Sequence, residues 1–73
     1  MMYRRIRDLR EDADLKQRQL AEELNVAQTT YSDYERGALD IPTALLIKLA
    51  QKYAVSVDYL LELTDDPTPP PRK

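Results

Sequence analysis

Apolar residues recur every three or four positions along most of the chain, which is the spacing of an α-helix rather than of a β-strand. In the first segment, Ile6, Leu9 and Ala13 share one face. The same periodicity appears in four further segments, and none alternates with a period of two for long enough to form a sheet. The predicted helices cover about residues 3–13, 17–24, 28–36, 42–53 and 57–61.

Few residues interrupt this pattern. Gly37, the single glycine, suits the left-handed conformation in which helices often end. Pro42 fits the first turn of the fourth helix, where a missing N–H costs nothing. Ser56 is a good N-cap for the fifth. The predicted fold class is therefore all-α, a compact bundle of five short helices.

The predicted helix over residues 28–36 has two unlike faces when it is wound at about 100° per residue. Tyr31 and Tyr34 fall on one side. The other side carries Gln28, Thr29, Ser32, Asp33 and Arg36. A merely solvated face usually carries long Lys, Glu and Gln side chains, whereas Thr, Ser and Asp are poor helix formers. This polar face is therefore predicted to contact a ligand.

The second and third predicted helices are joined by residues 25–27 alone, so they are expected to cross at a steep angle. Ala21 supplies the small residue that a close crossing needs, and Asn25 tolerates the positive φ of a tight turn. Apolar side chains on both helices are expected to lock the crossing: Leu20, Leu24, Val26, Tyr31 and Tyr34. This arrangement is a helix-turn-helix.

Composition limits the possible functions. The chain has 73 residues, enough for one domain with a small core, which we place at residues 1–64. Four of the nine residues from 65 to 73 are proline, which predicts a disordered tail in extended geometry. A ligand for a proline-recognising domain is the alternative for this tail, from the spacing of Pro67 and Pro70.

The chain contains no Cys and no His. Disulfides, thiolate or imidazole metal sites and imidazole catalysis are thereby excluded, and we expect no metal and no cofactor. Adjacent acids such as Glu22 and Glu23 point to different sides of a helix, so we expect no enzyme either. No apolar run approaches membrane-spanning length and no signal peptide begins the chain, which predicts a cytoplasmic protein that is not in a membrane.

The stretches LKQRQLAEELNVAQTTYSDYERG and LLIKLAQKYAVSVDYLL resemble the Xre family, the lambda- and 434-repressor-like helix-turn-helix domains. The resemblance extends over residues 6–63. It implies a lambda-repressor-like fold whose third helix enters the major groove of double-stranded DNA. The residues at base-facing positions of the family are Gln28, Thr29, Ser32 and Asp33.

The resemblance also assigns supporting roles. The positions implied to contact DNA phosphates are Lys16, Gln17, Thr30 and Arg36. Arg10 and Glu35 match a pair that joins the first helix to the third by a salt bridge. Lys16 and Ala27 depart from the family, which commonly places Ser or Thr N-caps there, and a lost cap costs about 1 kcal/mol.

Two hypotheses remain open at this stage. The first is a DNA-binding regulator of transcription, a small bacterial or phage repressor that acts as a homodimer on a palindromic operator. The dimer residues would be Val57, Tyr59, Leu60 and Leu63, although these could instead complete the core of a monomer.

The second hypothesis is an antitoxin-like or anti-repressor module that keeps the fold without reading DNA. A net charge of −2 and the carboxylate of Asp33 favour it, because a DNA-binding domain is usually basic. Under the first hypothesis, with no sensor domain attached, a regulatory protein partner is a further expectation.

Overall fold

The computed structural model describes residues 3–69, and these form five helices and no strand. The helices are α1 (Arg4–Asp12), α2 (Gln17–Glu23), α3 (Gln28–Arg36), α4 (Thr43–Tyr53) and α5 (Val57–Leu60). The predicted all-α, five-helix fold is confirmed, and α3 has the predicted limits. None of the helices within residues 3–69 has the length and apolar character that crossing a bilayer requires.

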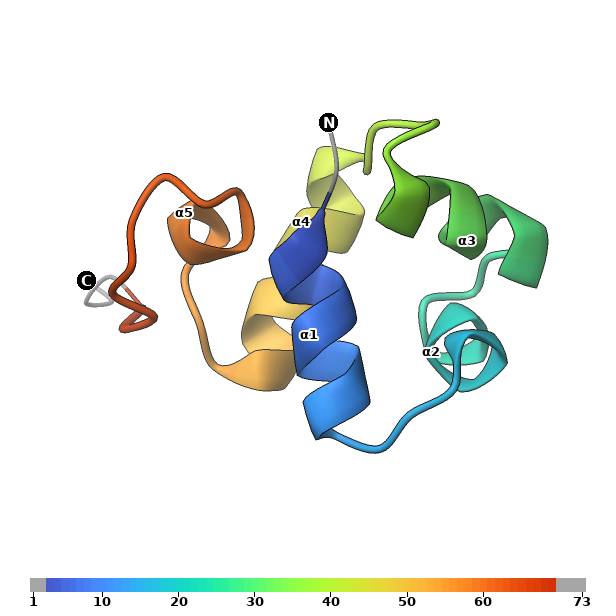
Figure 1. The fold of residues 1–73 in the computed structure, drawn as a ribbon, viewed down its shortest axis with the longest axis horizontal. Helices are drawn as coiled ribbons and strands as arrows, with labels where there is room; N and C mark the ends of the chain where they lie inside the picture. The colour runs from blue at the N-terminus through green and yellow to red at the C-terminus, as the bar shows by residue number, and fades with distance from the viewer. Residues whose placement is uncertain (1–2, 70–73) are drawn as a thin grey trace.

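Helix α1 lies at the centre of the molecule in Figure 1, with α3 on one side and α5 on the other. Contacts of α1 with both α3 and α5 agree with that view. Helix α2 packs against α3, and α4 packs against α5. Helix α1 therefore joins the α2–α3 pair to the α4–α5 pair.

Each helix contributes one fully buried side chain to a single core. These five side chains are Ile6, Leu20, Tyr31, Leu49 and Leu60. At the edge of the core, the hydroxyl of Tyr3 accepts a hydrogen bond from the N–H of Ile41 at 3.1 Å, which ties the start of α1 to the loop before α4. Ala13, predicted on the apolar stripe of the first helix, is instead exposed and caps the C-terminal end of α1.

Each of the five helices is followed by a residue with positive φ. Asp14 and Asn25 both have φ of 62°, as their tolerance of the left-handed region predicts, and Gly37 has φ of 80°. Ala54 at 53° and Glu62 at 61° also lie in this region. The sequence did not indicate these last two turns, because Ala and Glu carry no preference for positive φ.

The predicted N-cap of the fifth helix is present, since the Ser56 hydroxyl accepts a hydrogen bond from the N–H of Tyr59 at 3.0 Å. Lys16 provides no side-chain cap for α2. Instead, the side-chain oxygen of Gln19 reaches back and accepts from the N–H of Lys16 at 2.7 Å. Ala27 gives α3 no side-chain cap.

The chain after α5 folds back onto the domain, although the sequence predicted a disordered tail from residue 65. Arg5 donates to the carbonyl oxygens of Tyr59, at 2.9 Å, and of Thr64. It also pairs with the carboxylate of Asp65 at 2.7 Å. The carbonyl of Pro67 accepts from the N–H of Ser56 at 3.0 Å. Asp65 and Pro67 therefore contact the helical domain, and residues 70–73 of the predicted tail lie outside the described residues.

Candidate nucleic-acid interface

Helices α2 and α3 pack against each other, and Ala21, the small residue predicted at their crossing, is buried. This residue is 2% exposed, and its carbonyl accepts from the N–H of Val26 at 3.0 Å. Leu20, Leu24 and Tyr31 are buried beside it. The small side chain allows close approach, and the apolar neighbours hold α3 in one orientation.

The opposite face of α3 is open to solvent. Gln28 and Thr29 are exposed, and Ser32 is half-buried. Within residues 3–69, no side chain hydrogen-bonds to any of these three. Their donors and acceptors are consequently available to a ligand, as base reading requires.

Asp33, the fourth residue predicted to read bases, already has a partner on its own helix. Arg36, one turn further on, donates from Nη2 to its carboxylate. This pairing offsets the negative charge of Asp33, which would otherwise be repelled by DNA phosphates. Arg36 is 65% exposed and keeps its remaining N–H donors, which its predicted phosphate contact needs.

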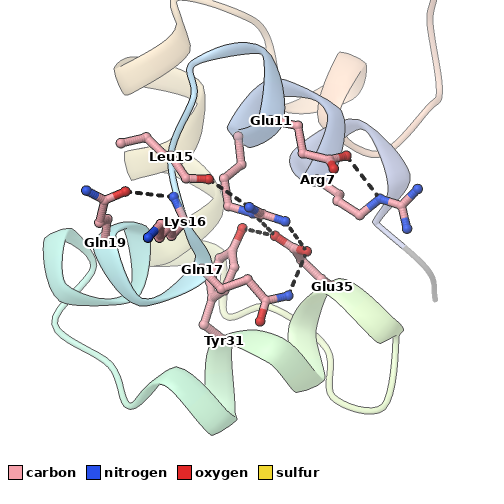
Figure 2. Close-up of polar contacts among 9 residues, drawn as sticks. Arg7, Glu11, Leu15, Lys16, Gln17, Gln19, Tyr31 and Glu35 are labelled. Atoms are coloured by element: carbon pink, nitrogen blue, oxygen red, sulfur yellow. Dashed lines mark hydrogen bonds and ion pairs between the residues drawn. The ribbon is translucent and has the colours of Figure 1, made fainter.

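A buried carboxylate, Glu35, joins three elements behind this face, as Figure 2 shows. Arg10 of α1 donates from Nε to Oε2 at 2.7 Å and from Nη2 to Oε1 at 3.2 Å, so the ion pair implied by the resemblance is present. Gln17 of α2 donates to Oε1 at 3.1 Å, and the hydroxyl of Tyr31 donates to Oε2. Arg10 also donates to the carbonyl of Leu15 at 2.8 Å.

This environment lowers the pKa of Glu35. Burial alone would raise it, but hydrogen bonds from Arg10, Tyr31 and Gln17 and the charge of Arg10 together outweigh burial. Burial and the hydrogen bond to Glu35 also raise the pKa of the Tyr31 hydroxyl. Glu35 is therefore ionised at neutral pH and holds α1, α2 and α3 together.

Three further residues predicted to contact phosphates differ in exposure. Lys16 is exposed, and Gln17 and Thr30 are half-buried. One N–H of the Gln17 amide is used by Glu35, so a phosphate could receive only the other. Sequence reasoning missed the bonds from Gln17 and Tyr31 to Glu35. The single local indication was a Tyr placed four residues before a Glu, a spacing at which helical side chains meet.

The four residues predicted at a dimer interface divide into two groups. Leu63 is 72% exposed, and Val57 and Tyr59 are half-buried. Leu60 is fully buried in the chain's own core and has no surface to offer a partner. Arg5 covers the Tyr59 ring, with its guanidinium carbon 4.1 Å from the ring centroid.

The side chains of the site include no candidate metal centre. Residues 3–69 contain no group of three or more His, Cys, Asp or Glu side chains that could hold a metal ion. What the site presents is a polar helix face flanked by basic and amide groups.

Known proteins resemble this chain. A family model described as "Helix-turn-helix" matches residues 6–60. The "Uncharacterized HTH-type transcriptional regulator YobD" of Bacillus subtilis is 45% identical over 69 residues, 94% of this chain and 62% of that protein. The "HTH-type transcriptional regulator ImmR" of the same organism is 41% identical over 58 residues, 80% of this chain and 46% of that protein.

A phage protein is also similar. The "Cryptic phage CTXphi transcriptional repressor RstR" of Vibrio cholerae is 36% identical over 61 residues, 84% of this chain and 55% of that protein. The chain therefore spans less than two thirds of the length of each of these relatives. No solved structure matches it at comparable significance.

Proposed function

Because this chain belongs to the Xre-like helix-turn-helix family, we propose that it is a sequence-specific DNA-binding regulator of transcription, a repressor that reads the major groove with α3. The observation that carries the proposal is the polar face of α3. Gln28, Thr29 and Ser32 have no side-chain partner within residues 3–69, while the opposite side of the helix is fixed in the core. A rigid helix with unused polar groups on one face suits a duplex groove.

The chemistry of this face favours particular base contacts. The Gln28 amide can donate to and accept from one adenine, and the Thr29 methyl group can touch a thymine methyl. The paired carboxylate of Asp33 can accept from a cytosine amino group. Lys16, Gln17, Thr30 and Arg36 would position the protein on the backbone, adding affinity but no sequence information.

We propose further that the protein acts as a homodimer on a palindromic operator. Leu63, with help from Val57 and Tyr59, supplies the apolar surface for pairing, and Leu60 is left out of this interface because it is buried. Two α3 helices would then meet half-sites separated by about 34 Å, one helical turn of DNA. The protein would act in the cytoplasm, and a partner protein could relieve repression.

Selection of duplexes from a random-sequence pool with the purified protein tests this function. We expect a palindromic consensus, and we expect Gln28→Ala combined with Thr29→Ala to lower affinity for it by at least tenfold, since each lost base contact is worth about 1–3 kcal/mol. Gln51→Ala is the matched control, because it removes the same amide from an exposed position on α4. Recovery of no consensus, or equal binding by the double variant, would contradict the proposal.

A second candidate function is the protein-interaction module without DNA binding. The net charge of −2, a pI near 5.0 and the missing side-chain cap at Ala27 favour it. The same selection separates the two functions, because an interaction module would enrich no sequence.

A further inference from the structure

A hollow of about 350 Å³ lies beside the polar face of α3. It is lined by Arg7 of α1, Gln17 of α2, and Glu35 and Arg36 of α3. One water occupies about 30 Å³ in the liquid, so the hollow has room for a hydrated phosphate group. Two guanidinium groups and an amide, all hydrogen-bond donors, thus border one space.

Arg7 is the lining residue whose donors are least used. Its side chain is 58% exposed, and its one partner within residues 3–69 is Glu11, with Nε 3.5 Å from the carboxylate oxygen. That separation exceeds the roughly 2.7–2.9 Å of a charge-assisted hydrogen bond. Figure 2 shows Arg7 and Glu11 together on α1, above Glu35. An exposed, loose ion pair of this kind contributes little to stability. Arg7 can therefore leave Glu11 for an anion that it binds more tightly.

The carboxylate of Glu35 does not make the hollow unsuitable for an anion. Its two oxygens already accept four hydrogen bonds, from Arg10, Gln17 and Tyr31, and Arg10 neutralises its charge. Arg36 likewise neutralises Asp33 and retains further donors. An incoming phosphate would therefore meet unused N–H groups rather than an unpaired acid.

The other basic residues at the start of α1 face elsewhere. Arg5 is committed to the segment after α5, where it donates to Tyr59, Thr64 and Asp65. Arg4 pairs with Glu62 at 3.6 Å, so it too is directed toward the α5 side. Figure 1 places α5 and α3 on opposite sides of α1. Of the three, Arg7 alone borders the hollow next to the polar face of α3.

We propose that Arg7 binds a phosphate of the DNA backbone in this hollow, together with Arg36 and the free N–H of Gln17. The inference rests on the proposed DNA-binding function and adds a phosphate ligand from α1 to it. It also assigns the hollow to a phosphodiester rather than to a small-molecule ligand.

The test measures the salt dependence of binding to the duplex recovered by selection, from about 50 to 200 mM NaCl. Arg7→Gln should reduce the slope of log K against log salt by about 0.9 for each bound subunit, because one phosphate contact is lost. Arg7→Lys should keep the wild-type slope. Arg4→Gln is the matched control, since it removes the same charge from the same helix on the other side, and its slope should be unchanged.

Ethylation interference on the same duplex locates the contact. Arg7→Gln should lose interference at one phosphate in each half-site and leave the rest of the pattern intact. Circular dichroism verifies that the variants fold, and Arg7→Met, which keeps the aliphatic stem, is a second neutral variant. If Arg7→Gln and Arg7→Met match Arg4→Gln in slope and pattern while the wild type binds its duplex, the inference is overturned and the proposed function stands. If the wild type binds no selected duplex, both fall.

Discussion

At the scale of single residues, Glu35 does most to fix the candidate interface. Its side chain is 4% exposed, and it receives donors from Arg10, Gln17 and Tyr31, which lie on three different helices. An ionised carboxylate is costly to bury unless it is paired and hydrogen-bonded, and here both conditions are met. The orientation of α3 relative to α1 and α2 therefore depends on one acidic side chain behind the polar face.

Replacing Glu35 by Gln should destabilise the domain strongly. The neutral amide cannot balance Arg10, which is only 12% exposed, so we expect a loss of about 3–5 kcal/mol at pH 7. That is a large part of the roughly 5–15 kcal/mol typical of a domain. Urea unfolding followed by circular dichroism measures the change. Glu22→Gln, at an exposed position on α2, should stay within about 0.5 kcal/mol of the wild type, and an equal effect at both sites would refute this account.

The depressed pKa of Glu35 also predicts how stability depends on pH. A carboxylate with a lower pKa in the folded state stabilises fully above its ordinary pKa, near 4.5, and that stabilisation is lost as the pH falls through the folded value. The difference in unfolding free energy between the wild type and Glu35→Gln should therefore narrow as the pH is lowered from 7 through about 4.5 and below. If the difference in unfolding free energy stays constant over this range, ionisation of Glu35 is not the cause of that difference.

At the scale of elements, short turns between helices set the geometry. Asn25 allows α2 and α3 to cross within three linking residues, and Gly37 ends α3. The turn between α4 and α5 is different, because Ala54 holds φ of 53° without being glycine or asparagine. An L-residue other than these pays about 1–2 kcal/mol in the left-handed region. The domain thus contains a strained position at the C-terminal end of α4.

Ala54→Gly should relieve that strain and stabilise the domain by about 1 kcal/mol. The matched control is Ala44→Gly, which makes the same substitution at an exposed position inside α4 and should destabilise by up to about 1 kcal/mol. Thermal unfolding of both variants measures whether each substitution raises or lowers stability. A loss of stability at both positions would mean that the backbone at Ala54 is not strained.

At the scale of the whole molecule, the α5 side and the α3 side of the domain differ in how their arginine side chains are used. On the α5 side, Arg4 and Arg5 are paired with Glu62 and Asp65, so their charges are neutralised locally. On the α3 side, Arg36 retains unused donors beside the polar face. Part of the acidic charge therefore lies away from the polar face of α3, because Asp58, Glu62, Asp65 and Asp66 are on the α5 side.

The proposed dimer surface gives a prediction at the same scale. Leu63→Asp should weaken self-association by at least tenfold and leave the monomer folded, because this side chain is 72% exposed. Leu60→Asp, three residues earlier, should instead unfold the domain, since it buries an unpaired charge at a fully buried position. Sedimentation velocity at several concentrations, with circular dichroism, measures both. Unchanged association of a folded Leu63→Asp variant would exclude Leu63 from the interface.

The sequence predicted the local features of this protein because each depends on residues close together in the chain. Helical periodicity gave five helices, the residues Asn25 and Gly37 indicated positive φ, and Ser56 indicated a cap. The unlike faces of α3 followed from the same periodicity. Fold class, the helix-turn-helix and the polar face were thus determined by the sequence alone.

Only the tertiary structure decided which long side chains serve the fold and which remain available to a ligand. Arg5 and Arg7 look equivalent in sequence, yet Arg5 reaches groups more than 50 residues away and Arg7 is left beside the open hollow. The burial of Leu60 and the contacts of Asp65 and Pro67 with the helical domain were decided in the same way. The physical reason is that such contacts join distant segments, and no local spacing records which segments the folded core brings together.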